Sequence, residues 1–438
     1  MPLKNRLLYL AWFFFFCSLP WFKAFASVAE VALLILTFAT GGFKHLKPTV
    51  LKYWPVAAIT LFFGALVAGL LFTQDLSNGW RVLKHQHRYL IIPLIFLANA
   101  PMLQKHFRQY LLSYILATTA AGLFVVLLYF LPEDLVRNLA NSTKLMRPYP
   151  TMADRTAFGL YSPFIDRLQF SSLTAIAILS SFYLIATGYS RRLLLAALPI
   201  LFYTMLILGG RSAQLALFAA LAVYALAIGL GYLAPKLKER RGTVAATLIL
   251  TSAGLVIFGL LPYLSFKLLE PVQNRLNQTT WEIEQLQSGN YKQYDYEHFT
   301  TFRRLVSVKN MWEVVQQAPL LGIGTGDYHP EIKKVYAQNN PEMEVNSHSQ
   351  YLMYWAMTGL WGLVLFLGIL FYWVNSLRRN RQLYFFGLAF LVFYLVNMLP
   401  DSVLYTQVDS MAFCSFLAFI GLQRSPSPFS AERKSENA

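Results

Sequence analysis

Long apolar runs separated by short polar segments dominate the 438-residue chain. Each run is roughly 17 to 25 residues long, the length that an α-helix needs to cross a bilayer core. Because 56% of the residues are hydrophobic and only 13% are charged, the composition agrees with a membrane-embedded chain. The pattern predicts an all-α polytopic membrane protein with about twelve transmembrane helices. The predicted spans lie near residues 7–22, 24–41, 54–73, 86–101, 110–131, 168–187, 193–209, 213–233, 244–262, 349–374, 383–399 and 408–422.

Two polar stretches are too long for simple connections between spans. The first covers residues 132–167, and the second covers residues 263–348, between predicted spans nine and ten. Within the second, residues 281–287 and 301–317 are predicted to be helical. The latter helix has apolar residues three and four positions apart, namely Phe302, Leu305, Val308, Met311, Trp312 and Val315. The expected organisation is nine spans over 1–262, a partly helical loop over 263–348, three spans over 349–422 and a polar tail over 423–438.

A glycine-rich segment, residues 322–326, follows Pro319 at the end of that predicted helix. It does not fit a dinucleotide-binding fingerprint, because it follows a helix instead of a strand and has a different spacing. We interpret it as a tight turn.

The positions of Lys and Arg predict the orientation, because these residues are retained on the cytoplasmic side during insertion. With the N-terminus inside, each cytoplasmic segment is basic, so both termini are expected to be cytoplasmic. The net charge of +16 then reflects topology and attraction to anionic membrane lipids, and it requires no nucleic-acid partner. The cations concerned are Lys4, Arg6, Lys44, Lys47, Lys52, Lys105, Arg108, Arg191, Arg192, Lys236, Lys238, Arg240, Arg241, Arg378, Arg379, Arg381, Arg424, Arg433 and Lys434.

Other cations lie on the outer side, where topology gives no reason for them. Arg81, Lys84 and Arg88 are three and four positions apart, so we expect them on one face at the start of the fourth span. Arg211 begins the eighth span at the same surface, where the free N–H groups and the dipole of a helix N-terminus also favour an anion. The pattern indicates an anionic ligand. The alternative is that the three cations extend to lipid headgroups or pair with Asp75.

His348 lies where the long polar stretch ends and the tenth span begins. A neutral His at such a position is a competent general base near neutral pH. Gly359 follows about three helical turns later and is expected under the same face. Gly359 and Gly362 would let a neighbouring helix approach closely and hold the His rigidly. Taken alone, a His at the end of a span is more often an interfacial hydrogen-bonding residue.

His348 and Ser349, followed by Gly359 and Gly362, match the motif H[NSQ]-x9-G-x2-[GTY]. With this motif the chain resembles the O-antigen ligase family, within a wider group that includes O-antigen polymerases and bacterial O-linked oligosaccharyltransferases. The motif resemblance covers about residues 200–370, and the span pattern extends it to the whole chain.

Two arginines add to the resemblance. Arg211 is similar to an arginine that begins a span in that group, and Arg304 with residues 319–324 resembles its outer-loop pattern R…P-hydrophobic-G-x-G. The family pattern often has an aromatic residue four positions after the loop arginine, where this chain has Val308. Arg303 also competes with Arg304 for the role.

The resemblance implies a glycosyltransferase of the bacterial inner membrane with its active site at the periplasmic face. It would move O-antigen from undecaprenyl diphosphate to a sugar hydroxyl of lipid A-core, by a single displacement that inverts the anomeric centre. His348 would be the general base, with Arg211 and Arg304 as catalytic cations. The residues expected to bind the diphosphate are Arg81, Lys84, Arg88, Arg211, Arg303 and Arg304.

A metal site was weighed against this interpretation. The large loop contains His298, His329, Asp295 and Glu297, but their spacings fit no pattern of metal ligands. We therefore expect no metal and no cofactor, with arginines replacing a divalent ion.

Three hypotheses remain: an O-antigen ligase, a polymerase or protein O-oligosaccharyltransferase of the same group, and a transporter of lipid-linked glycan. The lack of internal repeat symmetry and of evident charges in the middle of spans weighs against transport. The close match to the His motif and the chain length favour the ligase.

Overall fold

The computed structural model describes residues 3–142, 162–229, 267, 270–288 and 299–424. These residues form helices and no strand, which confirms the predicted all-α class. In chain order the helices are α1 (Leu3–Ser18), α2 (Lys23–Ala39), η1 (Gly42–His45), α3 (Leu46–Lys52), α4 (Trp54–Ala57), α5 (Ile59–Ala68), η2 (Gly69–Phe72), α6 (Leu76–Gln86), α7 (Arg88–Ala98), α8 (Ala100–Lys105), α9 (Phe107–Phe130), α10 (Glu133–Ser142), α12 (Arg167–Ala186), α13 (Arg191–Ile207), α14 (Arg211–Ile228), α17 (Glu270–Ser288), α18 (Thr300–Gln317), α19 (Tyr328–Asn339), α20 (Gln350–Ser376), α21 (Arg381–Asn397), η7 (Val403–Tyr405) and α22 (Gln407–Gly421).

Several helices are long and apolar enough to cross a membrane. Five in the described part of the chain meet this test, and a sixth does so if α2 and the segment Gly42–Lys52, bent by 74°, form one span. Helices α21 and α22 are apolar but shorter. The expected total of about twelve is therefore not confirmed. The predicted ninth span, 244–262, lies outside the described residues, whereas each of the other predicted spans overlaps a helix.

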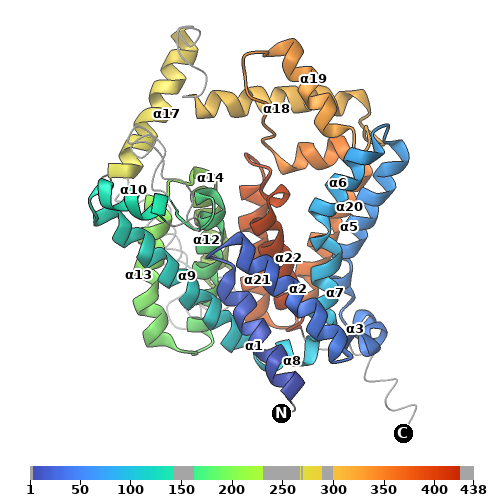
Figure 1. Cartoon of the computed structure of the whole chain (residues 1–438), viewed down its shortest axis with the longest axis vertical. Helices are drawn as coiled ribbons and strands as arrows, with labels where there is room; N and C mark the ends of the chain where they lie inside the picture. The colour runs from blue at the N-terminus through green and yellow to red at the C-terminus, as the bar shows by residue number, and fades with distance from the viewer. Residues whose placement is uncertain (1–2, 143–161, 230–266, 268–269, 289–298, 425–438) are drawn as a thin grey trace, which may run out of the picture.

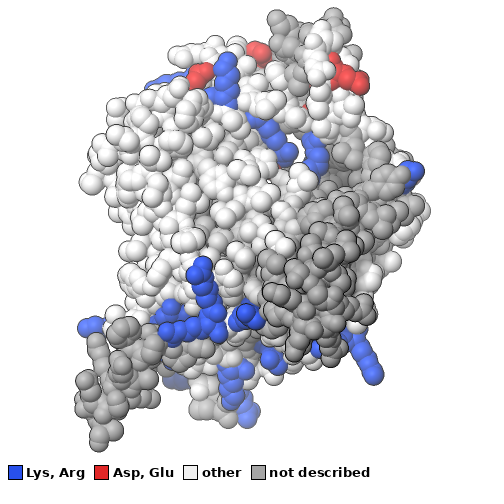
Figure 2. Space-filling view, turned by 180° about the vertical axis from the view of Figure 1, so that it is seen from behind, with Lys and Arg blue, Asp and Glu red and all other residues white. Residues whose placement is uncertain are grey.

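Helices α18 and α19 lie over one end of the bundle, and the N-terminus lies at the other (Figure 1). The last described residues lie near the N-terminal helix, since Gln104 donates to the carbonyl of Leu422 while Tyr9 donates to Gln109 at 3.3 Å. Both ends of the described chain thus share one end of the bundle. On the described part of the face in Figure 2, Lys and Arg gather toward the two ends, with an uncharged band between them.

The outer surface of α2 is apolar. Val28, Val31, Ile35 and Phe38 are exposed and recur every three or four residues, so they line one face of this helix. A row of exposed apolar side chains on a bundle of apolar helices is typical of contact with lipid. Together with the uncharged band in Figure 2, this supports a multi-pass membrane protein.

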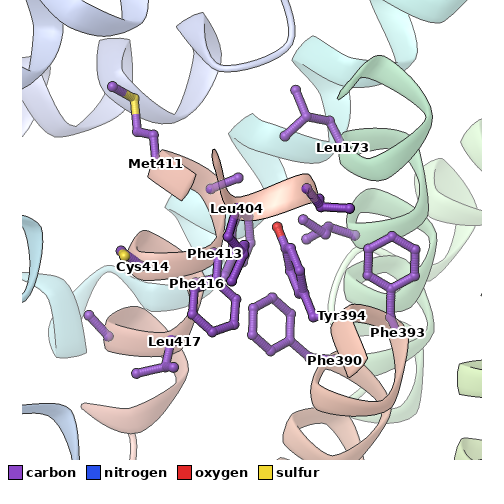
Figure 3. Packing of buried hydrophobic residues seen from close by; sticks show 14 of the residues in the cluster. Leu173, Phe390, Phe393, Tyr394, Leu404, Met411, Phe413, Cys414, Phe416 and Leu417 are labelled. Atoms are coloured by element: carbon purple, nitrogen blue, oxygen red, sulfur yellow. The ribbon is translucent and has the colours of Figure 1, made fainter. Parts of the chain in front are cut away.

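The core between α21 and α22 is aromatic. Figure 3 shows Phe390 and Tyr394 of α21 directed toward Phe413 and Phe416 of α22. The ring of Tyr394 meets that of Phe413 edge-on at 4.8 Å, and Phe390 stacks on Phe413 at 6.2 Å. Such aromatic pairs stabilise a contact beyond the area that they bury. The two helices are firmly packed, so the short loop that joins them is held in place.

The polar stretch after α14 contains the two predicted helices as α17 and α18. The predicted apolar face of α18 packs only in part. Met311, Val314 and Val315 are fully buried against the neighbouring helices, because α18 contacts α19 and α20 through its C-terminal half. Other apolar residues of the predicted face stay exposed, namely Leu305, Val308 and Trp312.

Candidate functional site

His348, immediately before α20, is hydrogen-bonded to a carboxylate. Its Nδ1 lies 3.1 Å from Oδ1 of Asp401, in the loop between α21 and η7. A carboxylate only accepts, so Nδ1 carries the hydrogen and Nε2 keeps its lone pair. No described residue hydrogen-bonds to Nε2. A carboxylate that fixes the tautomer of a histidine in this way is the usual support for a general base.

Asp401 is bound from three directions. Besides His348, it accepts a hydrogen bond from the Ser212 hydroxyl at 2.8 Å and from Nη2 of Arg304 at 3.1 Å. Burial by itself would raise the pKa of Asp401, but the hydrogen bond from His348, the charge of Arg304 and the hydrogen bond from Ser212 together lower it below its ordinary value. The carboxylate is therefore ionised at neutral pH, and an ionised carboxylate at Nδ1 favours the imidazolium form of a histidine ring.

Arg211, the first residue of α14, adds a second guanidinium to this cluster. It donates from Nη1 to the hydroxyl of Thr279 on α17, and it lies within electrostatic range of Arg304, Asp401 and Glu282. Glu282 is fully buried and accepts at 2.7 Å from the backbone N–H of residue 301, at the start of α18. The starts of α14 and α18 and the middle of α17 thus converge on Asp401.

The backbone before α20 is clamped by α18 and α19. Ser307 accepts from the N–H of His348 at 2.9 Å and donates to the carbonyl of Asn346 at 2.8 Å. From α19, the Tyr328 hydroxyl donates to the Ser347 hydroxyl at 2.8 Å. These bonds position the main chain of His348 independently of its ring.

Ser349 has a backbone conformation that residues other than glycine rarely adopt, with φ 112° and ψ 108°. Such a conformation costs about 1–3 kcal/mol and persists only where the surroundings fix it. Here the next residue, Gln350, donates its N–H to the carbonyl of Met398 at 3.0 Å and accepts from the N–H of Leu404 at 2.8 Å. The loop with Asp401 therefore holds the start of α20 beside it.

Comparison with known families gives one match to this chain. Residues 175–367 match the family model described as O-antigen ligase. Over this region, which is less than half of the chain, the sequence is similar to the O-antigen ligase family. The match confirms the resemblance and contains Arg211, Arg304 and His348, whereas Asp401 lies outside it. No curated protein matches the chain at a significant level.

The family motif's first glycine breaks α20 instead of continuing it. Gly359 has φ 74° and ψ 177°, and the N–H of Leu360 donates to the carbonyl of Pro319 at 3.0 Å. A Cβ at Gly359 would lie 2.1 Å from the carbonyl oxygen of Leu320, so only glycine fits. The close approach predicted here exists, but its partner is the loop after α18 and not a helix. The predicted common face with His348 is absent, because His348 precedes the helix.

Gly362, the second glycine of the motif, packs at the same kink in α20. A Cβ at Gly362 would lie 2.1 Å from the Thr358 hydroxyl oxygen, so Gly362 makes room for the side chain that turns back above the break. From the opposite side, Gly322 has φ 77° and would bring a Cβ to within 2.5 Å of the Gly359 nitrogen. The predicted glycine turn and the His motif therefore meet backbone to backbone.

The structure separates the two candidate loop arginines of the family pattern. Arg304 faces Asp401, as described above, whereas Arg303 pairs with the exposed Glu344 at 3.0 Å. Successive helical residues point about 100° apart, so only one of the two can face the cluster. Arg304 is the arginine that lies beside Asp401, the carboxylate bonded to His348.

The outer cations predicted to share one helix face are divided between two places. Helix α6 ends at Gln86 and α7 begins at Arg88, so Arg88 lies on a different helix from Arg81 and Lys84. Arg88 is buried, and its Nε lies 3.4 Å from Oε2 of Glu30 on α2, which offsets its charge. Arg81 and Lys84 instead line an open pocket between α6 and α19.

Asp401 is the residue that sequence reasoning missed. Its signal was the one acidic side chain in the short outer connection between predicted spans eleven and twelve. Within the described ranges, no group of three metal-ligating side chains occurs. Of the residues weighed for a metal site, His298, Asp295 and Glu297 lie outside those ranges, and His329 hydrogen-bonds to Tyr405 at 2.7 Å.

Proposed function

We propose that this protein is an inverting glycosyltransferase that joins O-antigen, carried on undecaprenyl diphosphate, to a sugar hydroxyl of lipid A-core. The family match supports glycosyl transfer of the O-antigen ligase and polymerase group. The observation that carries the specific reaction is the hydrogen bond between His348 and Asp401, with Arg304 and Arg211 beside it.

We place the reaction at the periplasmic face of the bacterial inner membrane, with both termini cytoplasmic. One end of the bundle holds both ends of the described chain. This end is basic, as cytoplasmic ends are, and so supports the orientation. There Arg424 donates to the carbonyl of Lys52, and Arg108 lies 5.8 Å from the ring of Tyr189. His348 lies toward the opposite end, beneath α18 and α19.

In the proposed step, His348 acts as general base. Its Nε2 takes the proton from the acceptor hydroxyl as that oxygen attacks the anomeric carbon of the donor sugar. Asp401 keeps Nδ1 protonated and stabilises the positive charge that develops on the ring. One carbon–oxygen bond forms as another breaks, so the anomeric configuration inverts.

The two arginines stabilise the departing undecaprenyl diphosphate. Arg304 uses only Nη2 for Asp401 among the described residues, so its remaining donors can reach phosphate oxygens. Arg211 is held by Thr279 and its neighbouring charges before any substrate arrives. Guanidinium groups fixed in advance stabilise charge that grows on a leaving group without reorganising during the step. We retain Arg211 and Arg304 in this role and omit Arg88 and Arg303, whose charges are paired with Glu30 and Glu344.

With guanidinium groups in this position, we expect no requirement for a divalent ion. Purified protein treated with EDTA and then desalted should retain its full transfer rate, and added Mg²⁺ should not raise it. Activity lost on chelation and restored by one particular metal would contradict the arginine-based mechanism.

Gene deletion with complementation tests the proposed function as a whole. We expect the deleted strain to have lipopolysaccharide core without attached chains and to accumulate carrier-linked polymer. The wild-type gene and the His87→Ala variant should restore ligation, and His348→Ala should not. A single repeat unit on the core would instead indicate a polymerase, and intact lipopolysaccharide with an unglycosylated protein an oligosaccharyltransferase. Full restoration by His348→Ala would refute the base mechanism.

A further inference from the structure

A cationic pocket, separate from the Asp401 cluster, lies between α6 and α19. It is open and has a volume of about 870 Å³, and Arg81, Lys84 and Lys333 line it. Asp75 is its one lining carboxylate, and that side chain already accepts the N–H of Asn78 at 2.9 Å to cap α6. The pocket therefore has an excess of positive charge, whereas two carboxylates balance the two arginines near His348.

Hydrogen bonds connect this pocket to the reaction centre. His329 lines the pocket and bonds through Nε2 to the Tyr405 hydroxyl at 2.7 Å, and Tyr405 follows Asp401 by four residues. The preceding residue of α19, Tyr328, donates to Ser347, the neighbour of His348. A ligand in the pocket would thus lie next to the loops that carry the base and its carboxylate.

The lowered pKa of His329 reflects the positive electrostatic potential in the pocket. Burial lowers the pKa of His329, and the charges of Arg81, Lys333 and His85 lower it further. The ring is therefore neutral at pH 7, and the positive charge of the pocket comes from Arg and Lys. These side chains keep their charge across the physiological range.

Trp80 adds an apolar surface to the same pocket. Its side chain lines the cavity and is 58% exposed, although α6 has buried positions available for large apolar residues. A flat aromatic ring among cations suits a ligand with one apolar face and one anionic group. A sugar ring that bears a phosphate has both.

We propose that the pocket between α6 and α19 binds a phosphorylated sugar of the acceptor glycolipid and so orients the acceptor hydroxyl toward His348. This rests on the proposed function. The acceptor is the better candidate because Arg211 and Arg304 already serve the donor diphosphate, whereas other cations, from α6 and α19, line this pocket. Arg81, Lys84, Lys333 and Trp80 are then specificity residues and take no part in proton transfer.

Equilibrium binding to the full-length, detergent-purified protein tests the proposal without requiring turnover. Three probes are compared: a phosphorylated core glycolipid, the same glycolipid dephosphorylated with hydrofluoric acid, and undecaprenyl diphosphate without glycan. In the double variant Arg81→Gln/Lys333→Gln, the Kd for the phosphorylated glycolipid should rise about ten-fold or more, from the loss of two exposed charge-assisted contacts. The Kd values for the other two probes should not change. Trp80→Ala should weaken both glycolipids.

Lys334→Gln is the matched control, because Lys334 adjoins Lys333 but pairs with Glu331 outside this pocket. Weaker binding of undecaprenyl diphosphate in the double variant would overturn the proposal and assign the pocket to the donor. An equal effect on both glycolipids, or no effect on either, would also overturn it. A wild-type protein that binds the phosphorylated glycolipid through these cations but transfers no glycan would preserve the pocket and refute the proposed function.

Discussion

The protein contains two clusters in which a carboxylate lies between a histidine and an arginine. The Asp401 cluster consists of His348, Asp401 and Arg304. The Glu30 cluster consists of His87, Glu30 and Arg88, with separations of 3.3 and 3.4 Å from the carboxylate. The residue types correspond, so their different surroundings decide what each cluster can do.

The Asp401 cluster is assembled from loops and helix ends, whereas the Glu30 cluster joins two helices in the bundle. The side chain of Asp401 is 15% exposed and that of Arg304 25%, against 8% for Glu30 and 7% for Arg88. Asp401 accepts three well-directed hydrogen bonds, while Oε1 of Glu30 has none within the described residues. Accessible and fully bonded groups are suited to chemistry, and a buried ion pair is suited to holding helices together.

Replacing each histidine with alanine should give the largest difference between the two clusters. His348→Ala should lower kcat by roughly 10²–10⁴-fold, the usual contribution of a general base, with little change in thermal stability. His87→Ala should leave kcat unchanged, because its ring belongs to the Glu30 cluster. Initial rates of glycan transfer with purified protein would measure both. Equal losses in the two variants would refute the distinction between the clusters.

Replacing each carboxylate with its amide should lower activity in the Asp401 cluster and stability in the Glu30 cluster. Asp401→Asn keeps the shape but loses the charge that holds His348 in its tautomer, and kcat should fall on the order of 10²-fold. Glu30→Gln leaves Arg88 buried without its counter-ion, which should cost about 3–5 kcal/mol of stability. Transfer rates and the apparent Tm in detergent give the two readouts. A stable, fully active Asp401→Asn protein would show that His348 needs no carboxylate.

Local sequence patterns identified the helices and His348, but not the partner of His348. Apolar periodicity is a local property, and α18 was predicted within a residue of its observed start. Asp401 lies 53 residues from His348 and 97 from Arg304, so its role arises only when distant segments pack together. Arg88 was placed with Arg81 because the sequence around His87 contains no proline or glycine to announce that the helix ends there.

The adjacent loop arginines illustrate the same limit and provide a sharper test. Arg304→Lys keeps a positive charge but loses the planar fork of donors that Asp401 and a phosphate can share, so kcat should fall about ten-fold. Arg303→Lys should have no such effect, because its partner Glu344 is exposed. Steady-state rates at saturating donor would compare the two. A larger loss in Arg303→Lys would assign the family's loop arginine to the other position.

Ser212→Ala should have the smallest effect, because it removes one of the three hydrogen bonds to Asp401. A single hydrogen bond to a carboxylate contributes about 1.5 kcal/mol or less at a partly exposed site, so kcat should fall several-fold. The bond also helps to lower the pKa of Asp401. The charge of a carboxylate with a lowered pKa persists as the pH falls below the ordinary value, so without Ser212 it should be lost at a higher pH. The pH at which the Asp401 carboxyl takes up its proton, followed by the infrared absorption of the carboxylate, should therefore be higher in Ser212→Ala. Ser180→Ala is the control, because its buried hydroxyl has no partner among the described residues, and it should leave that pH unchanged.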